Sequence, residues 1–212
     1  MTKLIRKTFS VPPLGCNCSI ISDPITKQAV IIDPGGAPER ILREVTQLGL
    51  TVSHILHTHA HLDHFLASSE IKKATGAVIC LHQGDLELWR NLELQCRVFG
   101  VAYVPAVAPD HWLCDEEKIL VGQEPVLALH TPGHTPGSIS FHFPNEQLLL
   151  AGDTLFRGSI GRTDLWGGDF KTIETSIRER LYTLDEITTV VAGHGPDTSI
   201  GDERETNQFI RM

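Results

Sequence analysis

The sequence predicts an α/β protein in which two sheets pack together and helices lie outside them. Two observations lead to this fold class: short β-rich segments outnumber the helical ones, and the two kinds alternate along the chain. Because a sheet buries one face and a helix one stripe, such interleaved elements favour helices layered on sheets. The length of 212 residues suits one domain with a sizeable core, and we assign residues 1–212 to it.

The first half of the chain is expected to alternate strands with helices. β-branched runs bounded by Pro, Gly and Asp predict strands, and apolar residues three and four apart predict helices. Pro38 starts one such helix and Gly49 ends it. The strands expected in this half are residues 3–9, 18–22, 29–33, 54–57 and 77–81. The other helices expected in this half are residues 66–74 and 85–94.

The second half begins with a stretch, residues 95–117, for which no element is predicted because it shows no clear periodicity. Beyond it, the spacing of Ile173, Ile177 and Leu181 predicts a helix, and a further helix is expected to close the chain. The strands expected in this half are residues 118–121, 126–130, 138–143, 148–151 and 188–192. The two helices are expected over residues 172–181 and 202–210.

Composition narrows the possible functions. A net charge of −8 argues against nucleic acid as a partner, because phosphate binding requires a basic surface. The chain has no apolar run long enough for a membrane span, and its first residues lack the apolar core of a signal peptide. The five cysteines form no disulfide framework, so we expect reduced thiols in a cytoplasmic protein. We expect a small molecule as the partner and a monomer or small homo-oligomer.

Four side chains that can bind metal lie within six residues, directly after an apolar run. They are His59, His61, Asp63 and His64. Imidazole nitrogen and carboxylate oxygen are ligands that Zn²⁺, Fe²⁺ and Mn²⁺ accept. In a loop, the first three would lie on one side and His64 would turn toward another, so the spacing favours two ions over one. A surface histidine tract is the plain alternative, but a solvated tract would not follow a buried strand.

Three further turns carry residues of the same kind at the ends of predicted strands. His134 lies between two Pro-Gly pairs, Asp153 follows the run 148–151, and His194 lies between Gly193 and Gly195. Pro-Gly pairs make stiff turns, as a fixed ligand requires, and a buried aspartate needs a partner. Each turn alone could contain its residue by chance, but their joint occurrence predicts a metal site. The Cys16-Asn17-Cys18 run is a weaker metal candidate, because it has no second cysteine pair.

These seven positions together resemble the ligand pattern of the metallo-β-lactamase superfamily, and the resemblance covers nearly the whole chain. It implies an αββα sandwich of two mixed sheets flanked by helices, with the site at one edge. It also implies two divalent metal ions, with Zn²⁺ expected and Fe²⁺ or Mn²⁺ as alternatives. By position, the first ion would be held by His59, His61 and His134. The second would be held by Asp63, His64 and His194, and Asp153 would bridge the two.

The segment from Leu155 to Asp164 resembles the glyoxalase II-like group within this superfamily. That resemblance implies hydrolysis of a glutathione thioester such as S-lactoylglutathione, as in methylglyoxal detoxification. Asp63 would be catalytic by orienting the attacking hydroxide, and Arg157 and Arg162 would bind the glutathione carboxylates. Two features depart from the pattern of glyoxalase II itself: the sequence stops soon after His194, where that enzyme carries a carboxy-terminal helical domain, and Asp164 stands where it has a tyrosine. The pattern therefore looks most like short, single-domain hydroxyacylglutathione hydrolases.

A second group with a similar segment, the persulfide dioxygenases, suggests an alternative function. There, one Fe²⁺ would be held by His59, His134 and Asp153 and would react with O₂ and glutathione persulfide. Against it, His194 is followed by Gly195 and a proline, where those enzymes usually have Asp-Tyr. A lactonase or β-lactamase is disfavoured by the Gly-Arg-Thr-Asp segment, and a non-catalytic module by the retention of every ligand. Trp166 could line the mouth of the substrate site or pack inside the protein.

Overall fold

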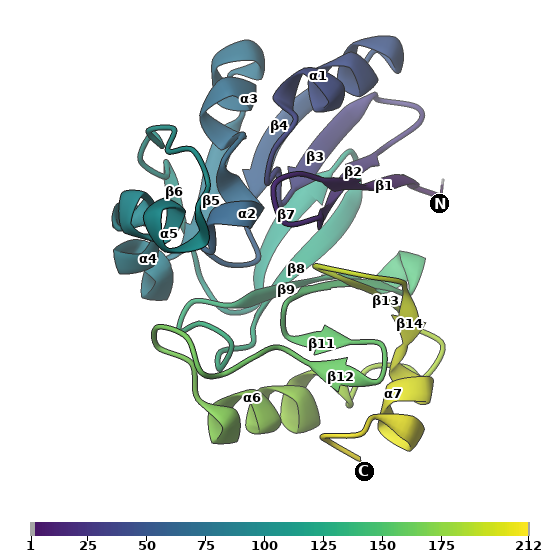
Figure 1. Cartoon of the computed structure of the whole chain (residues 1–212). Coiled ribbons are helices and arrows are strands. Elements are labelled where there is room, and N and C mark those ends of the chain that lie inside the picture. The colour runs from purple at the N-terminus through teal and green to yellow at the C-terminus, as the bar shows by residue number, and fades with distance from the viewer. Residues whose placement is uncertain (1–2, 212) are drawn as a thin grey trace.

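Two six-stranded mixed sheets pack face to face, and helices cover the outer side of each sheet (Figure 1). This computed structural model describes residues 3–211. The first sheet, in spatial order, consists of β1 (Ile5–Val11), β2 (Cys16–Ser22), β3 (Gln28–Ile32), β4 (Thr51–Leu56), β5 (Val78–His82) and β6 (His111–Leu113). The second consists of β14 (Thr198–Ser199), β13 (Thr189–Ala192), β10 (Leu148–Gly152), β9 (Ile139–Phe143), β8 (Glu124–His130) and β7 (Glu117–Val121). A separate ribbon pairs β11 (Leu155–Phe156) with β12 (Ser159–Ile160).

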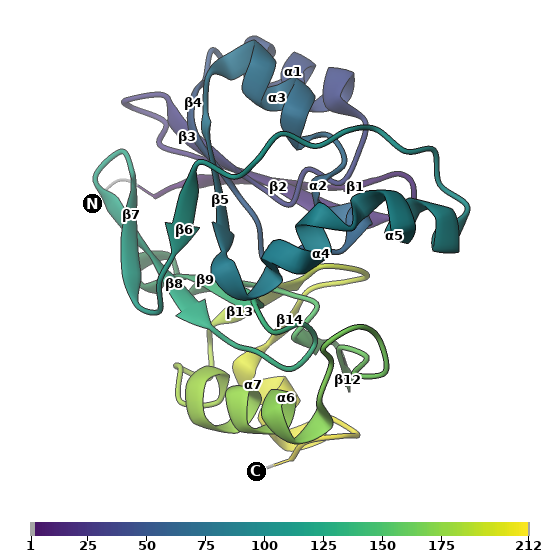
Figure 2. The ribbon, with the colours of Figure 1, turned by 90° about the vertical axis from the view of Figure 1, so that its left-hand side faces the viewer.

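The helices fall into two groups, one for each sheet (Figures 1 and 2). The group beside the first sheet consists of α1 (Pro38–Gln47), α2 (Leu62–Phe65), α3 (Ser68–Thr75), α4 (Leu86–Arg90) and α5 (Leu92–Phe99). The group beside the second consists of α6 (Phe170–Ser176), which continues as a π-helical turn (Ile177–Leu181), and α7 (Ile200–Thr206). Two 3₁₀ turns, Gln83–Asp85 and Pro144–Glu146, complete the elements. No helix within residues 3–211 is long and apolar enough to cross a membrane.

The core has three layers because the central strands bury both faces. In β3, Val30 and Ile32 face the layer between the two sheets, whereas Ile31 faces the layer beneath the first group of helices. A third layer, which includes Ile173 and Ile177, lies between the second sheet and its helices. Strands buried on both faces read as continuous apolar runs. The fold class predicted from the sequence, an αββα sandwich, is confirmed.

Strand direction brings several strand ends to one edge of the sandwich. In the first sheet β3, β4 and β5 run parallel. In the second, β10 and β13 run parallel, and β8 and β10 are both antiparallel to β9, so β8, β10 and β13 share a direction. The sheets join at this edge, where Ile139 donates its N–H to the Thr58 carbonyl and Asn17 donates to the Gly193 carbonyl, each at 2.7 Å. The turns that follow β4, β8, β10 and β13 therefore meet there.

The structure corrects several expected boundaries. The metal loop was expected to be irregular, but α2 begins at Leu62, within it. The helix expected over residues 85–94 is divided at Asn91, and its second part continues to Phe99. The closing helix ends at Thr206 instead of residue 210, because the Asn207 side chain accepts the N–H groups of Phe209 and Ile210 and turns the chain. The pattern did not predict the short strands β6, β11, β12 and β14. The five cysteines are free, as expected.

Candidate metal centre

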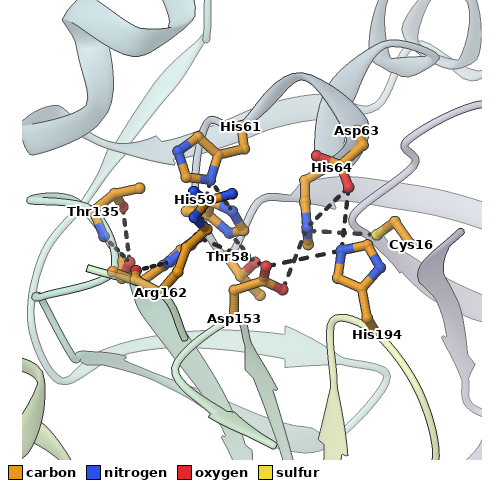
Figure 3. Close-up of polar contacts among 12 residues, drawn as sticks. Cys16, Thr58, His59, His61, Asp63, His64, Thr135, Asp153, Arg162 and His194 are labelled. Atoms are coloured by element: carbon orange, nitrogen blue, oxygen red, sulfur yellow. Dashed lines mark hydrogen bonds and ion pairs between the residues drawn. The ribbon is translucent and has the colours of Figure 1, made fainter. Parts of the chain in front are cut away.

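The seven predicted ligands come from four turns and gather at the shared edge of the sheets (Figure 3). The turn after β4 provides the four ligands predicted in the metal loop. The turns after β8, β10 and β13 provide His134, Asp153 and His194. Every ligand except Asp153 and His194 is buried. Because α2 begins within the metal loop, Asp63 and His64 lie on its first turn, and Asp63 Oδ2 lies 3.1 Å from His194 Nε2. The His64 ring lies between the two sets of side chains, with its centroid 4.0 Å from that of His59 and 5.4 Å from that of His194. The division into two groups stays a prediction, and a helical turn, not an extended loop, carries Asp63 and His64.

The first group consists of His59, His61 and His134, whose ligand atoms converge. The His61 Nδ1 atom lies 3.1 Å from His59 Nε2 and 2.9 Å from His134 Nε2. His134 Nδ1 donates a hydrogen bond to the backbone carbonyl of Arg162 at 2.8 Å. Because a carbonyl can only accept, this bond places the proton on Nδ1 and leaves a lone pair on Nε2. The three nitrogens can therefore face one cation.

Burial keeps two of these imidazoles neutral. It lowers the pKa of His59 well below its usual value, and lowers that of His61 to about 3. The neighbouring histidines lower both pKa values further, because two imidazolium charges repel. A neutral imidazole is the form that binds a metal ion. At neutral pH His59 and His61 therefore offer lone pairs and carry no positive charge.

The second group consists of Asp63, His64 and His194. His194 Nε2 lies 3.1 Å and His64 Nε2 lies 3.8 Å from Asp63 Oδ2. His64 Nδ1 donates to the carboxylate of Asp33 at 3.0 Å, so Nε2 is the ring nitrogen that would face a cation. Burial would lower the pKa of His64, but the carboxylates of Asp63, Asp153 and Asp33 outweigh it and raise this pKa above its usual value, so Nε2 would give up its proton on binding a metal. Burial alone would raise the pKa of Asp63, but His64 and His194 outweigh it and lower this pKa. Asp63 is therefore a carboxylate at neutral pH.

Asp153 lies between the two groups. Its Oδ2 atom is 3.6 Å from His134 Nε2 in the first group and 3.8 Å from His194 Nε2 in the second. Its Oδ1 atom is 3.5 Å from His64 Nε2. One carboxylate therefore reaches both groups, which is the position of a bridging ligand.

Unpaired buried atoms provide a test of whether cations fit here. Among the described residues, three buried side-chain polar atoms have no hydrogen-bond partner: His61 Nε2, His64 Nε2 and Asp153 Oδ1. Such atoms are costly unless a ligand satisfies them. His64 Nε2 and Asp153 Oδ1 face each other, and a cation between them would pair with both. For His61 Nε2, the ring nitrogen not directed at the first group, we have no such account. The donor set is one that divalent Zn, Fe and Mn accept.

Asp33 is a supporting residue that the sequence analysis did not identify. This buried carboxylate accepts hydrogen bonds from the Thr58 N–H at 2.8 Å and the Thr58 hydroxyl at 2.6 Å, as well as from His64. It thereby fixes the start of the metal loop and the orientation of His64. A Cβ on Gly35 would lie 1.5 Å from the Asp63 carbonyl oxygen, so only glycine fits this close approach. The sequence feature that could have identified Asp33 is its position at the end of a predicted strand, directly before a Pro-Gly pair.

Asp85 is a second supporting residue, and it ties two ligand-bearing turns together. This buried carboxylate accepts hydrogen bonds from the Ala60 N–H at 2.9 Å, the Thr135 hydroxyl at 2.8 Å and the Gly137 N–H at 2.6 Å. Burial raises its pKa, and these hydrogen bonds oppose the shift. Asp85 was expected in the first turn of a helix. Nothing in the local sequence distinguishes it from an ordinary solvent-exposed aspartate.

Gln95 holds the metal loop on both sides of His61. Its side-chain oxygen accepts from the Leu62 N–H at 2.9 Å, and its side-chain nitrogen donates to the Ala60 carbonyl at 3.0 Å. It also donates to the Leu88 carbonyl at 2.8 Å, which anchors the loop to α4. Gln95 falls in the stretch for which the sequence predicted no element.

The Cys-Asn-Cys run does not form a separate metal site. Cys16 Sγ lies 3.5 Å from His64 Nδ1, and Cys18 is buried in the core. Burial raises the pKa of Cys16 to about 12, so its thiol stays protonated, whereas metals bind thiolate. Asp33, the third possible ligand in this group, already accepts hydrogen bonds from Thr58.

The two arginines predicted to bind substrate lie outside the buried cluster. Arg162 contributes its backbone carbonyl to His134, while its exposed guanidinium pairs with both carboxylate oxygens of Asp164 at 2.7 and 2.9 Å. Arg157 is exposed in the turn between β11 and β12. The buried Glu203 accepts the N–H of Gly158 at 2.9 Å and so anchors that turn to α7. The binding role of both arginines stays a prediction.

Comparison with known proteins identifies relatives over nearly the whole chain. A family profile described as the metallo-beta-lactamase superfamily matches residues 11–194. A protein of Haemophilus influenzae named hydroxyacylglutathione hydrolase GloC is 40% identical over 196 residues, which is 92% of each chain.

Solved structures show the same fold. The B3 metallo-beta-lactamase BLEG-1 matches with a TM-score of 0.91 at 36% identity, over 97% of this chain and 99% of that one. TTHA1623 in a di-iron-bound form matches with a TM-score of 0.89 at 37% identity, over 96% and 100%. ETHE1 from Myxococcus xanthus matches with a TM-score of 0.81 at 29% identity, over 96% and 83%. These relatives share an architecture, and their names differ in activity and metal.

Proposed function

Because the chain belongs to the metallo-beta-lactamase superfamily, we propose that it is a metal-dependent thioester hydrolase. Its substrate would be an S-2-hydroxyacylglutathione such as S-lactoylglutathione, and its products glutathione and a 2-hydroxy acid. The observation that carries the proposal is the position of the Asp153 carboxylate between two groups of ligands. The 40% identity to a protein named hydroxyacylglutathione hydrolase supports the thioester as the substrate class. The proposed role is methylglyoxal detoxification in the cytoplasm.

The proposed cofactor is a pair of divalent cations, Zn²⁺ first, with Fe²⁺ or Mn²⁺ as alternatives. The first group would hold one cation, the second group the other, and Asp153 both. When bound, such a pair supplies a hydroxide nucleophile from water near neutral pH and polarises the carbonyl of the substrate. The protein contributes fixed ligands: Asp33 orients His64, and the Arg162 carbonyl orients His134. Such outer partners hold the tautomer and direction of each ring.

Asp63 is the proposed catalytic residue of the chain. Its Oδ2 atom lies 3.1 Å from His194 Nε2, and its side chain is almost wholly buried. As a carboxylate at neutral pH it can accept the hydrogen bond of an attacking hydroxide and direct it toward the substrate. Asp63 would combine this role with that of a ligand.

Anaerobic hydrolysis distinguishes the proposal from the dioxygenase alternative. We expect the metal-loaded protein to release thiol from S-lactoylglutathione at the same rate with and without O₂, because hydrolysis consumes only water. Thiol release would be followed with a thiol reagent in an anaerobic cell, and O₂ uptake with an electrode. Consumption of O₂ with glutathione persulfide, together with inertness toward the thioester, would replace the hydrolase with the dioxygenase.

Replacing Arg162 by alanine is expected to raise KM and leave kcat nearly unchanged. The guanidinium would bind a glutathione carboxylate away from the reacting carbonyl, so it stabilises ground and transition states alike. A lost charge-assisted hydrogen bond of about 1.5–3 kcal/mol corresponds to roughly a 10- to 150-fold fall in kcat/KM. The substitution keeps the backbone carbonyl that His134 needs. Steady-state kinetics with S-lactoylglutathione would measure it.

Two comparisons make the Arg162 result specific. Arg178→Ala removes a half-buried arginine of the π-helical turn after α6 that pairs with Glu174 and donates to the Arg211 carbonyl, and it should change neither constant. A small thioester without glutathione should lose little rate in Arg162→Ala. An equal loss with both substrates would mean that Arg162 supports the metal centre instead of binding glutathione.

A further inference from the structure

A pocket of about 320 Å³ lies beside the metal centre, and none of the seven predicted ligands lines it. Its walls come from α4, α5, the turn that carries His134, and the loop after Arg162. Its lining residues include Leu88, Leu94, Pro136 and Trp166. Its volume exceeds the cavity of about 150 Å³ that accommodates benzene in an engineered protein. It can therefore hold a phenyl-sized group.

The pocket shares structural parts with the metal centre. Gln95, which lines the pocket, is hydrogen-bonded to the backbone on both sides of His61. Pro136, on the opposite wall, lies two residues after His134. Gly167 packs so closely on Pro136 that an added Cβ would lie 2.6 Å from its ring. The loop that carries Trp166 is therefore held against the turn that carries His134.

The chemistry of the pocket suits an uncharged, apolar group. None of the residues described as lining it is cationic, and its one charged side chain is the exposed carboxylate of Glu87, which pairs with Arg90. Glutathione carries two carboxylates, so this lining does not favour it. Arg157 and Arg162, the proposed contacts for those carboxylates, do not line the pocket. A thioester has two ends, and the end left for the pocket is the acyl group.

We propose that this pocket binds the apolar side chain of the acyl group, and that the preferred substrates are thioesters of 2-hydroxy acids with apolar or aromatic side chains. This proposal rests on the proposed thioester hydrolysis. Trp166 is the specificity-determining residue, because it offers an aromatic face at the pocket and is 38% exposed. An aromatic ring of the substrate can stack on that face.

Kinetics with a matched pair of substrates tests the proposal. One added methylene in an apolar pocket is worth about 10- to 200-fold in kcat/KM, so the phenyl group of S-mandeloylglutathione should raise kcat/KM over that of S-lactoylglutathione by about tenfold or more. Trp166→Ala should remove most of that advantage, with a larger loss for the mandeloyl than for the lactoyl substrate. Trp112→Ala, which removes a tryptophan of similar exposure on β6, should change neither rate.

A binding measurement on the metal-loaded protein separates this proposal from the hydrolase. Mandelate and lactate would be titrated while the indole N–H resonance of Trp166, identified by its loss in Trp166→Ala, is followed by NMR. We expect mandelate to shift this resonance and lactate to leave it in place. Hydrolysis of both thioesters at equal rates, with no shift, would overturn the pocket proposal and leave the hydrolase standing. A shift with mandelate but hydrolysis of neither thioester would do the reverse.

Discussion

Replacement of Asp153 by alanine is expected to abolish most turnover and to reduce the bound metal. Its carboxylate lies 3.6 Å from His134 Nε2, 3.5 Å from His64 Nε2 and 3.8 Å from His194 Nε2, so it reaches both groups. Loss of a partner behind a metal ligand already costs about 10- to 100-fold in affinity or activity. A direct, bridging ligand should therefore cost more than about 100-fold in kcat/KM. Kinetics and elemental analysis of the same preparation measure both effects.

Single-group variants extend this prediction. His59→Ala should weaken the first ion and His194→Ala the second, and each should lose most of the activity because two ions act together. Asp197→Ala is the matched control, since Asp197 is an exposed carboxylate near His194 that pairs with Arg6. It should keep both activity and metal. Metal content and turnover like those of the unmodified protein in His194→Ala would contradict the two-ion assignment.

Replacement of Asp85 by alanine is expected to give the largest loss of stability among the variants considered. The substitution leaves the Ala60 N–H and the Gly137 N–H without an acceptor in a buried place, whereas the Thr135 hydroxyl keeps Ser138 as a partner. Each unsatisfied buried group costs about 1–3 kcal/mol, so the free energy of unfolding should fall by about 2–6 kcal/mol. Chemical denaturation at fixed pH and metal concentration measures it.

The metal centre should respond to the same substitution. Asp85 joins the metal loop to the turn that carries His134, so Asp85→Ala should also lower the affinity of the first group for metal. Asp197→Ala again serves as the control, because an exposed pair contributes only about 0–1 kcal/mol. If the free energy of unfolding of Asp85→Ala lay within about 1 kcal/mol of that of the unmodified protein, water or a shifted backbone would have to satisfy the two N–H groups.

The gathering of the seven predicted ligands at one edge could be expected from sequence, because residue type and strand direction point to the same place. Histidine and aspartate are the residue types that metals select, and each stands in a turn after an apolar run. Strands of common direction end at the same edge, so residues as distant as His59 and His194 come together. The central strands could also be predicted, because burial on both faces gives continuous apolar runs such as residues 29–32.

What sequence could not reveal depends on contacts between distant segments. Asp85 looks like an ordinary acidic residue at the start of a helix, and Gln95 lies in a stretch with no predicted element. Only the packed chain shows that they hold the backbone beside His61. The ribbon strands β11 and β12 have two residues each, too few to show an alternating pattern. In the metal loop, the sequence pattern alone could not reveal the helical turn of α2 that carries Asp63 and His64.

The most direct test of the two-metal hydrolase is a titration of metal-free protein with Zn²⁺ and, in parallel, with Fe²⁺ under anaerobic conditions. Bound metal per chain would be determined by elemental analysis, and hydrolysis of S-lactoylglutathione would be measured at each point. We expect two equivalents to bind and the rate to reach its plateau only at the second, because both groups of ligands and the Asp153 bridge are needed. Binding of only one equivalent of metal, or a rate of hydrolysis that reaches its plateau at the first equivalent, would contradict the account.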